Sequence, residues 1–185
     1  MDMTAWNQLI EEAVALGAFK AGVIPVSAVS FDRSFRDICE TNACGKCGRC
    51  WMCPPDIGDI DVLMEQARGY DWLLVYQTVS RLEDSFDFEG MMEAAHQHSL
   101  LSRQIEQLCA GRIPGQRLHL GAGGCHVCDT CSKVDNEPCR HPDLAMASLE
   151  GYGVNVSELA AASGMKYING QNTVTYFGAV FFKEG

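Results

Sequence analysis

Apolar positions along the chain follow helical spacing in some stretches and short continuous runs in others. Side chains such as Ile60, Leu63, Met64 and Ala67 recur every three or four residues, which predicts one apolar helix face turned to a core. Helices are expected in this way over residues 4–17, 31–40, 60–67, 88–109, 144–150 and 156–163.

Runs rich in β-branched and aromatic residues predict strands between these helices. The run at 71–79 is almost continuously apolar, as in a buried strand. Pro25 cannot donate a ladder hydrogen bond, so we expect its strand at a sheet edge. Strands are expected over residues 23–29, 71–79, 116–120 and 173–182.

This order of elements indicates an α/β or α+β fold with about four to five strands in one sheet and flanking helices. The chain has 185 residues, which suits a single domain over 1–185. Both cysteine-rich regions described below lie next to predicted strands. We therefore expect these loops to converge at one end of the sheet.

Charge and hydropathy narrow the possible environments and partners. The net charge of −10 argues against nucleic acid as a partner, because phosphate binding needs a basic surface. No apolar run is long enough to span a membrane. Residues 1–19 lack the basic start and apolar middle of an export signal, so we expect a cytoplasmic protein whose ten cysteines stay reduced as metal ligands.

Four cysteines between residues 121 and 142 have the spacing of an iron–sulfur loop. Three follow each other at C-x2-C intervals, and a fourth arrives after seven residues. The four are Cys125, Cys128, Cys131 and Cys139. A [4Fe–4S] cluster takes four thiolates, so this set predicts one such cluster. Zinc is the alternative, although its C-x2-C pairs are usually separated by a longer loop; His126 and His141 would be further candidates for it.

A second region holds five cysteines for four ligand positions. They are Cys39, Cys44, Cys47, Cys50 and Cys53. From Cys44 to Cys53 the spacing repeats that of bacterial ferredoxins, one residue short in the last interval. We predict that at least one of Cys47 and Cys50 is a ligand, which would close a second cluster.

Several motifs together resemble a family known only as a predicted metal-binding domain of unknown function, found largely in anaerobic bacteria and archaea. The motifs span nearly the whole chain: Asn42-x-Cys44-Gly45-Lys46, Trp51-Met52-Cys53-Pro54-Pro55, Gly124-Cys125-x2-Cys128-x2-Cys131, Pro138-Cys139-Arg140-x-Pro142, Ser148-Leu149-Glu150-x-Tyr152-Gly153 and Asn172-Thr173-Val174-Thr175-Tyr176.

The resemblance implies metal binding and supplies no reaction. It implies Cys39, Cys44 and Cys53 as ligands in the first region, and all four cysteines in the second. This chain departs from the family pattern at Cys47, where Tyr is usual, and at Cys50, where a residue other than cysteine is usual.

Three functions follow as expectations. The first is an electron carrier with one or two [4Fe–4S] clusters that docks on a redox partner protein through its acidic surface. The second is an enzyme in which an incompletely ligated cluster binds a small molecule, with Lys46, Arg49 or His126 as contacts. The third is a structural zinc module.

Overall fold

The computed structural model describes residues 3–184, which form an α+β fold around one five-stranded mixed sheet, as expected. The strand order is β1-β2-β5-β3-β4. All neighbouring pairs are antiparallel except β3 and β4. The strands are β1 (Lys20–Pro25), β2 (Trp72–Arg81), β3 (Arg117–Gly121), β4 (Ala147–Ser148) and β5 (Thr173–Phe182).

The centre of the sheet is the pairing of β2 with β5 over ten residues of each strand, from Trp72↔Phe182 to Arg81↔Thr173. Side chains alternate between the two faces along each strand. Leu73 of β2 belongs to one core cluster and Leu74 to the other, and both are fully buried. The apolar run predicted at 71–79 is therefore a strand buried on both faces.

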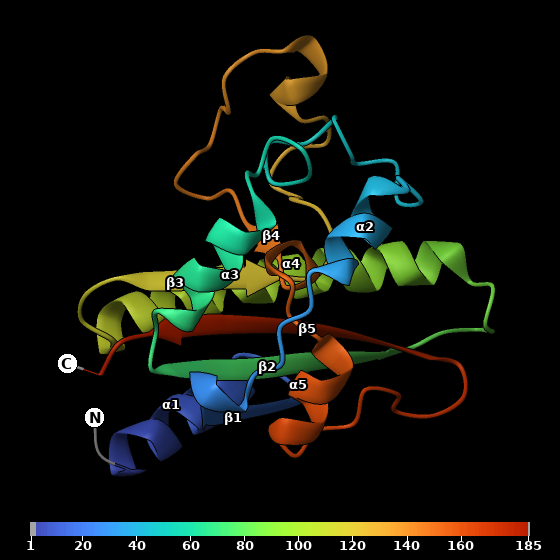
Figure 1. Cartoon of the computed structure of the whole chain (residues 1–185). Helices are drawn as coiled ribbons and strands as arrows, with labels where there is room; N and C mark the ends of the chain where they lie inside the picture. The colour runs from blue at the N-terminus through green and yellow to red at the C-terminus, as the bar shows by residue number, and fades with distance from the viewer. Residues whose placement is uncertain (1–2, 185) are drawn as a thin grey trace.

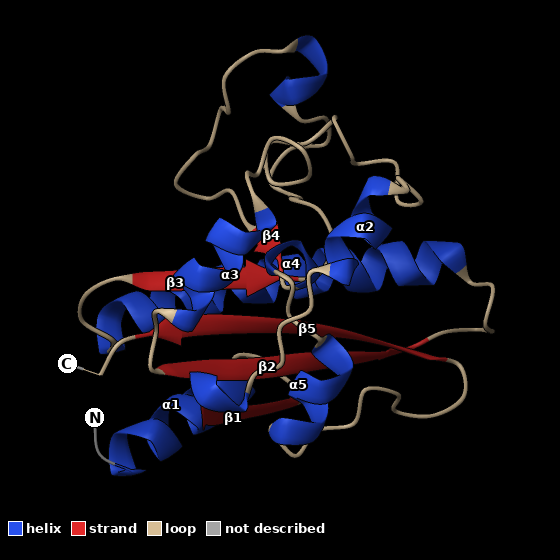
Figure 2. Cartoon of the chain, in the orientation of Figure 1, coloured by secondary structure: helices blue, strands red, loops and turns tan. Residues whose placement is uncertain are grey.

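Helices cover both faces of the sheet (Figures 1 and 2). The core cluster on one face includes residues of α1 (Met3–Ala15) and α4 (Phe88–Arg112). The cluster on the other face includes residues of α3 (Ile60–Arg68) and α5 (Val156–Ala162). Each helix presents the apolar stripe that its sequence spacing predicted.

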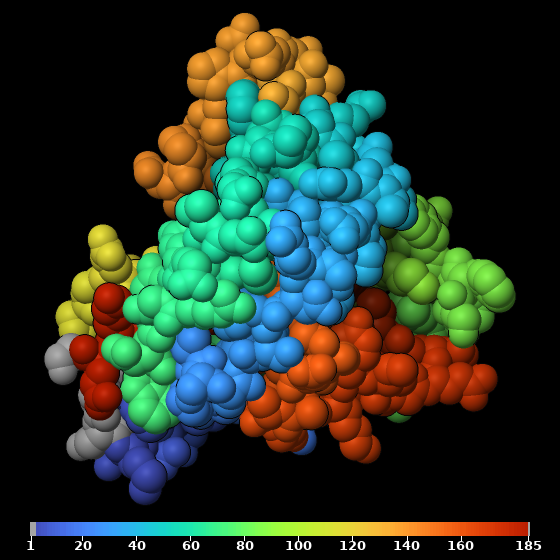
Figure 3. All heavy atoms as spheres, in the orientation of Figure 1, coloured from blue at the N-terminus to red at the C-terminus, as the bar shows by residue number. Residues whose placement is uncertain are grey.

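The two cysteine regions form a separate lobe, which we call the cysteine lobe and define as residues 39–59 and 122–146. Figure 1 shows both segments beyond β4, the outermost strand on that side of the sheet. In the space-filling view the two segments pack against each other at the top of the molecule (Figure 3). A short helix, α2 (Ser34–Glu40), leads into the first segment.

One element prediction was wrong in its bounds and another in its type. The strand expected at 23–29 lies at the sheet edge, as Pro25 predicted, but it runs from Lys20 to Pro25, and a 3-10 turn, Val26–Ala28, follows the proline. The helix expected at 144–150 is absent, and residues 147–148 form β4. Leu120 and Gly121 of β3 pair with this segment, so a long-range ladder overrides its local helical pattern.

The helices of residues 3–184 include none with the length and apolar character required to cross a bilayer.

Candidate metal centre

The four cysteines of the second segment surround one small cavity. Cys125, Cys128, Cys131 and Cys139 all line it, together with Ser132 and His141. Ser132 is buried, and its hydroxyl donates a 2.9 Å hydrogen bond to the Pro138 carbonyl. This bond closes the turn that brings Cys139 back toward the three preceding cysteines. The four thiols of the predicted set thus line one cavity in the fold.

Four of the five cysteines in the first segment line a second cavity, of about 250 Å³. They are Cys39, Cys44, Cys47 and Cys53. Asn42 shapes this loop: its backbone is left-handed at φ 57°, and its side-chain oxygen accepts a 3.0 Å hydrogen bond from the Cys47 amide. An asparagine tolerates that backbone conformation better than most residues. Cys47 thereby faces the same cavity as Cys39, Cys44 and Cys53, the ligands that the resemblance implies.

Cys50 stands apart from the other four. It is 1 % exposed and does not line the cavity. The Cys53 thiol donates a hydrogen bond to the Cys50 sulfur, which lowers the pKa of Cys50 and raises that of Cys53. Burial acts to raise the pKa of both thiols. In Cys50 the hydrogen bonds, including those donated by the amides of Met52 and Cys125, outweigh burial. Cys50 therefore links the two cysteine segments.

The two cavities adjoin, so the predicted convergence of the cysteine regions is confirmed, although they meet beyond the β4 edge. Gly124, the residue before Cys125, lines the first cavity. A Cβ at Gly124 would lie 3.4 Å from the Cys53 sulfur, a contact that glycine leaves open.

Three side-chain contacts join the segments further. The Trp51 indole donates a 2.9 Å hydrogen bond to the Glu137 carbonyl. The Lys133 ammonium lies 4.3 Å from the centre of the Trp51 ring and forms an ion pair with Asp56. Trp51 is therefore a polar contact between the two loops.

Buried charge lies beside the first cavity. The Arg36 guanidinium is buried and donates to the carbonyls of Gly58 and Gly151, at 2.8 and 3.3 Å. Glu150 lines the cavity, and burial raises the pKa of its carboxyl. Burial, and then the nearby Glu150, also raise the pKa of the Cys39 thiol. This arrangement places a carboxyl of raised pKa in the same cavity wall as several thiols.

Four further residues line neither of the two cysteine cavities. Cys109 is fully buried in the core on the α4 face, where it packs as a small apolar side chain. His98 is 2 % exposed and forms a 2.9 Å hydrogen bond with Thr78, so it is a core histidine. His126 and Arg49 are exposed and line neither cysteine cavity.

Arg36, Glu150 and Arg103, whose guanidinium donates to the His126 carbonyl, were not recognised from the sequence as parts of this region. Glu150 belongs to a motif of the family resemblance, but nothing in the motif indicates a cavity. Arg36 and Arg103 lie on helices, where charged residues usually face solvent. Only the packing of the helices against the cysteine segments gives these residues their positions.

The side chains of the described residues do not form a compact site for a single metal ion. Residues 3–184 contain no group of three or more Cys, His, Asp or Glu side chains arranged to hold a single metal ion. All nine cysteines of the two segments are free thiols, as is Cys109. The thiols thus surround cavities rather than one tight coordination point.

Comparison with known proteins is informative at the level of the family. Searches of curated proteins and of solved structures each gave no match. A family model described as "Predicted metal-binding protein (DUF2284)" matches residues 22–182, which include both cysteine segments and all five strands except the start of β1. With its cysteines grouped around two adjoining cavities, the chain belongs to this predicted metal-binding family.

Proposed function

We propose that this protein binds two [4Fe–4S] clusters and transfers electrons to or from a partner protein. The observation that carries the proposal is the gathering of Cys125, Cys128, Cys131 and Cys139 around one cavity. Such a cluster offers one-electron chemistry when bound. The protein's part is to supply the thiolates and to shield them from solvent.

The spacing of the cysteines along the chain favours a cluster over a zinc ion. The C-x2-C pairs of zinc sites are usually separated by a longer loop, whereas only two residues separate Cys128 from Cys131. A four-iron cluster takes one thiolate at each of four separate corners, which suits this spacing. The cavity of about 20 Å³ is smaller than such a cluster, so the loop would have to open as the cluster binds.

Two adjoining sites suit electron transfer within the protein. Gly124 and Cys125 belong to the second segment, yet Gly124 faces the first cavity and the Cys125 amide donates to Cys50. Electrons would therefore have to cross only this short junction. The net charge of −10 supports docking on a basic partner surface.

The direct test is a count of iron and acid-labile sulfide, with an EPR spectrum, on protein purified without oxygen. We expect about eight irons and eight sulfides per chain, from two four-iron clusters. Zinc in place of iron would refute the cluster proposal and support a structural zinc module.

A matched pair of variants assigns one cluster to the second segment. Cys139→Ser should remove about half of the iron, because it deletes one of four ligands. Cys109→Ser changes the same chemical group in the apolar core and should leave the iron content unchanged. Equal iron loss in both variants would point to general misfolding and remove the assignment.

A second candidate, an enzyme, is favoured by the larger cavity of the first segment. At about 250 Å³ it far exceeds the cavity of about 20 Å³ in the second segment, and Cys44 at its wall is exposed. If Cys39, Cys44 and Cys53 are the only ligands there, one corner remains free for a small molecule. Glu150 would then be the nearest acid, and Lys46 a nearby cation, because its side chain packs against Gly124.

Cyanide distinguishes the two candidates, because it binds an iron that has a free coordination position. We expect no cyanide-dependent change in the EPR signal of the parent protein. The variant with both Cys47→Ser and Cys50→Ser should lose one cluster or gain an exchangeable iron. A parent protein that already binds cyanide, with iron content unaffected by the two substitutions, would favour the enzyme.

A further inference from the structure

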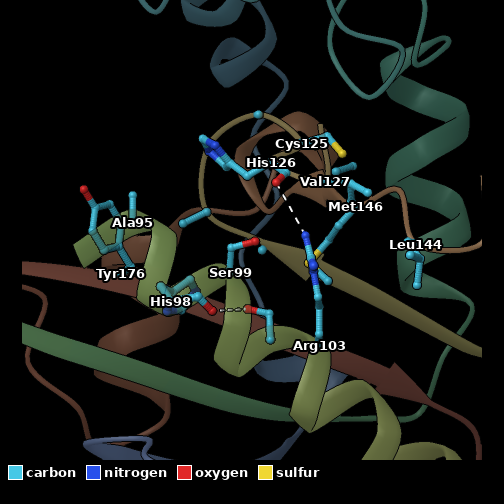
Figure 4. Close-up of a pocket in the computed structure, with 16 residues that line it drawn as sticks. Ala95, His98, Ser99, Arg103, Cys125, His126, Val127, Leu144, Met146 and Tyr176 are labelled. Atoms are coloured by element: carbon cyan, nitrogen blue, oxygen red, sulfur yellow. Dashed lines mark hydrogen bonds between the residues drawn. The ribbon is translucent and has the colours of Figure 1, made fainter. Parts of the chain in front are cut away.

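A third cavity lies on the other side of the second cysteine segment, between that segment and helix α4 (Figure 4). Its volume is about 30 Å³. One wall is the face of α4 that carries His98, Ser99, Ser102 and Arg103. The opposite wall is the backbone from Gly121 to Val127, which includes the ligand candidate Cys125. None of the cysteine chemistry described above uses the α4 wall.

Several polar groups of this wall already have partners. Ser102 donates to the His98 carbonyl at 2.8 Å and accepts from Tyr76 at 2.7 Å. The Tyr176 hydroxyl donates to the Met91 carbonyl at 3.0 Å. These groups have no remaining proton to offer to a ligand in the cavity.

Other groups of the wall remain available. The Arg103 guanidinium extends across the hollow, and its only hydrogen bond to the described residues is a long one of 3.5 Å to the His126 carbonyl (Figure 4). No salt bridge to Arg103 is found among residues 3–184. The Ser99 hydroxyl makes no hydrogen bond within that part of the chain. His98, by contrast, is already engaged by Thr78 and by the Phe177 carbonyl and offers no free group to a ligand.

The charge of this hollow differs in sign from that of the whole molecule. The chain carries 24 acidic residues against 14 lysines and arginines, yet no Asp or Glu lines this cavity. An arginine without a carboxylate partner, at the edge of a cavity without acids, has the chemistry of an anion site. Guanidinium groups match the planar, two-oxygen geometry of carboxylates especially well.

We propose that this cavity binds a small oxyanion of the size of formate, held by the Arg103 guanidinium and the Ser99 hydroxyl. Ser99 and Arg103 are four residues apart on α4, so both side chains project from one helix face toward the same point. A planar anion accepts hydrogen bonds from both side chains, and His98 lines the cavity beside them.

The size of the cavity limits the ligand. One water needs about 10 to 15 Å³ of such volume, so about 30 Å³ accommodates only a few non-hydrogen atoms. Nucleotides and sugar phosphates are too large. The site thus selects small anions by size and charge.

The position next to Cys125 gives the site a redox consequence, which rests on the proposed cluster at that cysteine. A negative charge on the far side of the loop disfavours adding an electron to the cluster. A bound anion should therefore shift the reduction potential of the second cluster to more negative values.

Formate is the probe for the test, with ¹³C-formate line broadening and calorimetry as binding readouts that need no activity. We expect saturable binding to the anaerobically purified protein. Arg103→Gln, which removes the charge and retains hydrogen-bond donors, should weaken binding at least tenfold, and Ser99→Ala severalfold. Formamide, neutral and of similar size, should bind weakly to all variants.

Arg112→Gln is the matched control, because it removes the same charge from the same helix at a site where Arg112 pairs with Glu12. Formate binding should be unchanged in it. Circular dichroism and iron content, measured on each variant, separate loss of the site from loss of the fold or of the clusters. The proposal is overturned if formate binds no more tightly than chloride, or if Arg103→Gln and Arg112→Gln behave alike.

Discussion

The sheet and the cysteine lobe differ sharply in how much apolar surface they bury. In β5, six consecutive residues, 177–182, are buried, and β2 has a run of five at 73–77. In the lobe segment 122–146 the only buried residue is Ser132. Ordering a residue costs about 1 to 2 kcal/mol of backbone entropy, which the sheet offsets by hydrophobic burial. This segment lacks that source of stability, and we infer that bound metal supplies it.

The largest expected effect comes from removing the metal. Chelation under oxygen-free conditions should abolish the order of residues 122–146, because metal binding and loop ordering are one equilibrium. The sheet should remain folded. Hydrogen exchange followed by mass spectrometry measures both regions at once. If residues 122–146 stayed protected from hydrogen exchange without metal, the lobe would be ordered by its own packing, contrary to this expectation.

A pair of identical substitutions tests the same contrast by packing alone. Val180→Ala in β5 deletes two fully buried methyl groups and should destabilise the protein by about 2 to 3 kcal/mol, from lost transfer energy and the cavity left behind. Val134→Ala in the lobe, where the side chain is 44 % exposed, should cost less than about 0.5 kcal/mol. Denaturant unfolding of both variants gives the two values, and similar costs would show that the lobe has an apolar core of its own.

Acid should weaken the core through His98. Burial lowers the pKa of this histidine to about 4, from 6.5. Between these values the unfolded chain binds a proton that the folded protein excludes, so stability falls as pH drops from about 6.5 toward 4. We expect a loss of about 2 kcal/mol between pH 7.5 and 5.

The matched variant for this experiment is His98→Gln, which cannot titrate. Its stability should fall less than that of the parent protein over the same pH range, and the difference isolates His98 from any acid damage to the metal sites. Parallel curves for the two proteins would show that His98 does not carry this pH dependence.

The smallest expected effect concerns the contact between the two lobe segments. Trp51→Phe keeps an aromatic ring under Lys133 but removes the hydrogen bond to the Glu137 carbonyl. A hydrogen bond of this kind is worth about 1 kcal/mol. We expect a slightly lower temperature for thermal loss of metal, with the unfolding of the sheet unchanged. A change in the sheet transition instead would mean that the lobe and the sheet unfold together.

Local sequence patterns determined most of the layered fold. Helices α1, α3 and α4 and strands β2 and β5 appear close to their predicted positions, because apolar periodicity records which face of each element is buried. The cysteine spacing likewise indicated a group of four ligands around one centre, since short C-x2-C intervals force neighbouring thiols toward the same point.

Tertiary structure alone decided the features that depend on contacts between distant segments. β4 exists only because residues 147–148 pair with β3. Cys47 faces the cavity of Cys39, Cys44 and Cys53 while Cys50 turns to Cys125, a choice that equal spacing in the sequence leaves undetermined. Arg103 reaches the third cavity only because α4 packs beneath the second segment. Spacing along the chain constrains neighbours within a few residues, whereas the packing of whole elements decides which side chains meet across the fold.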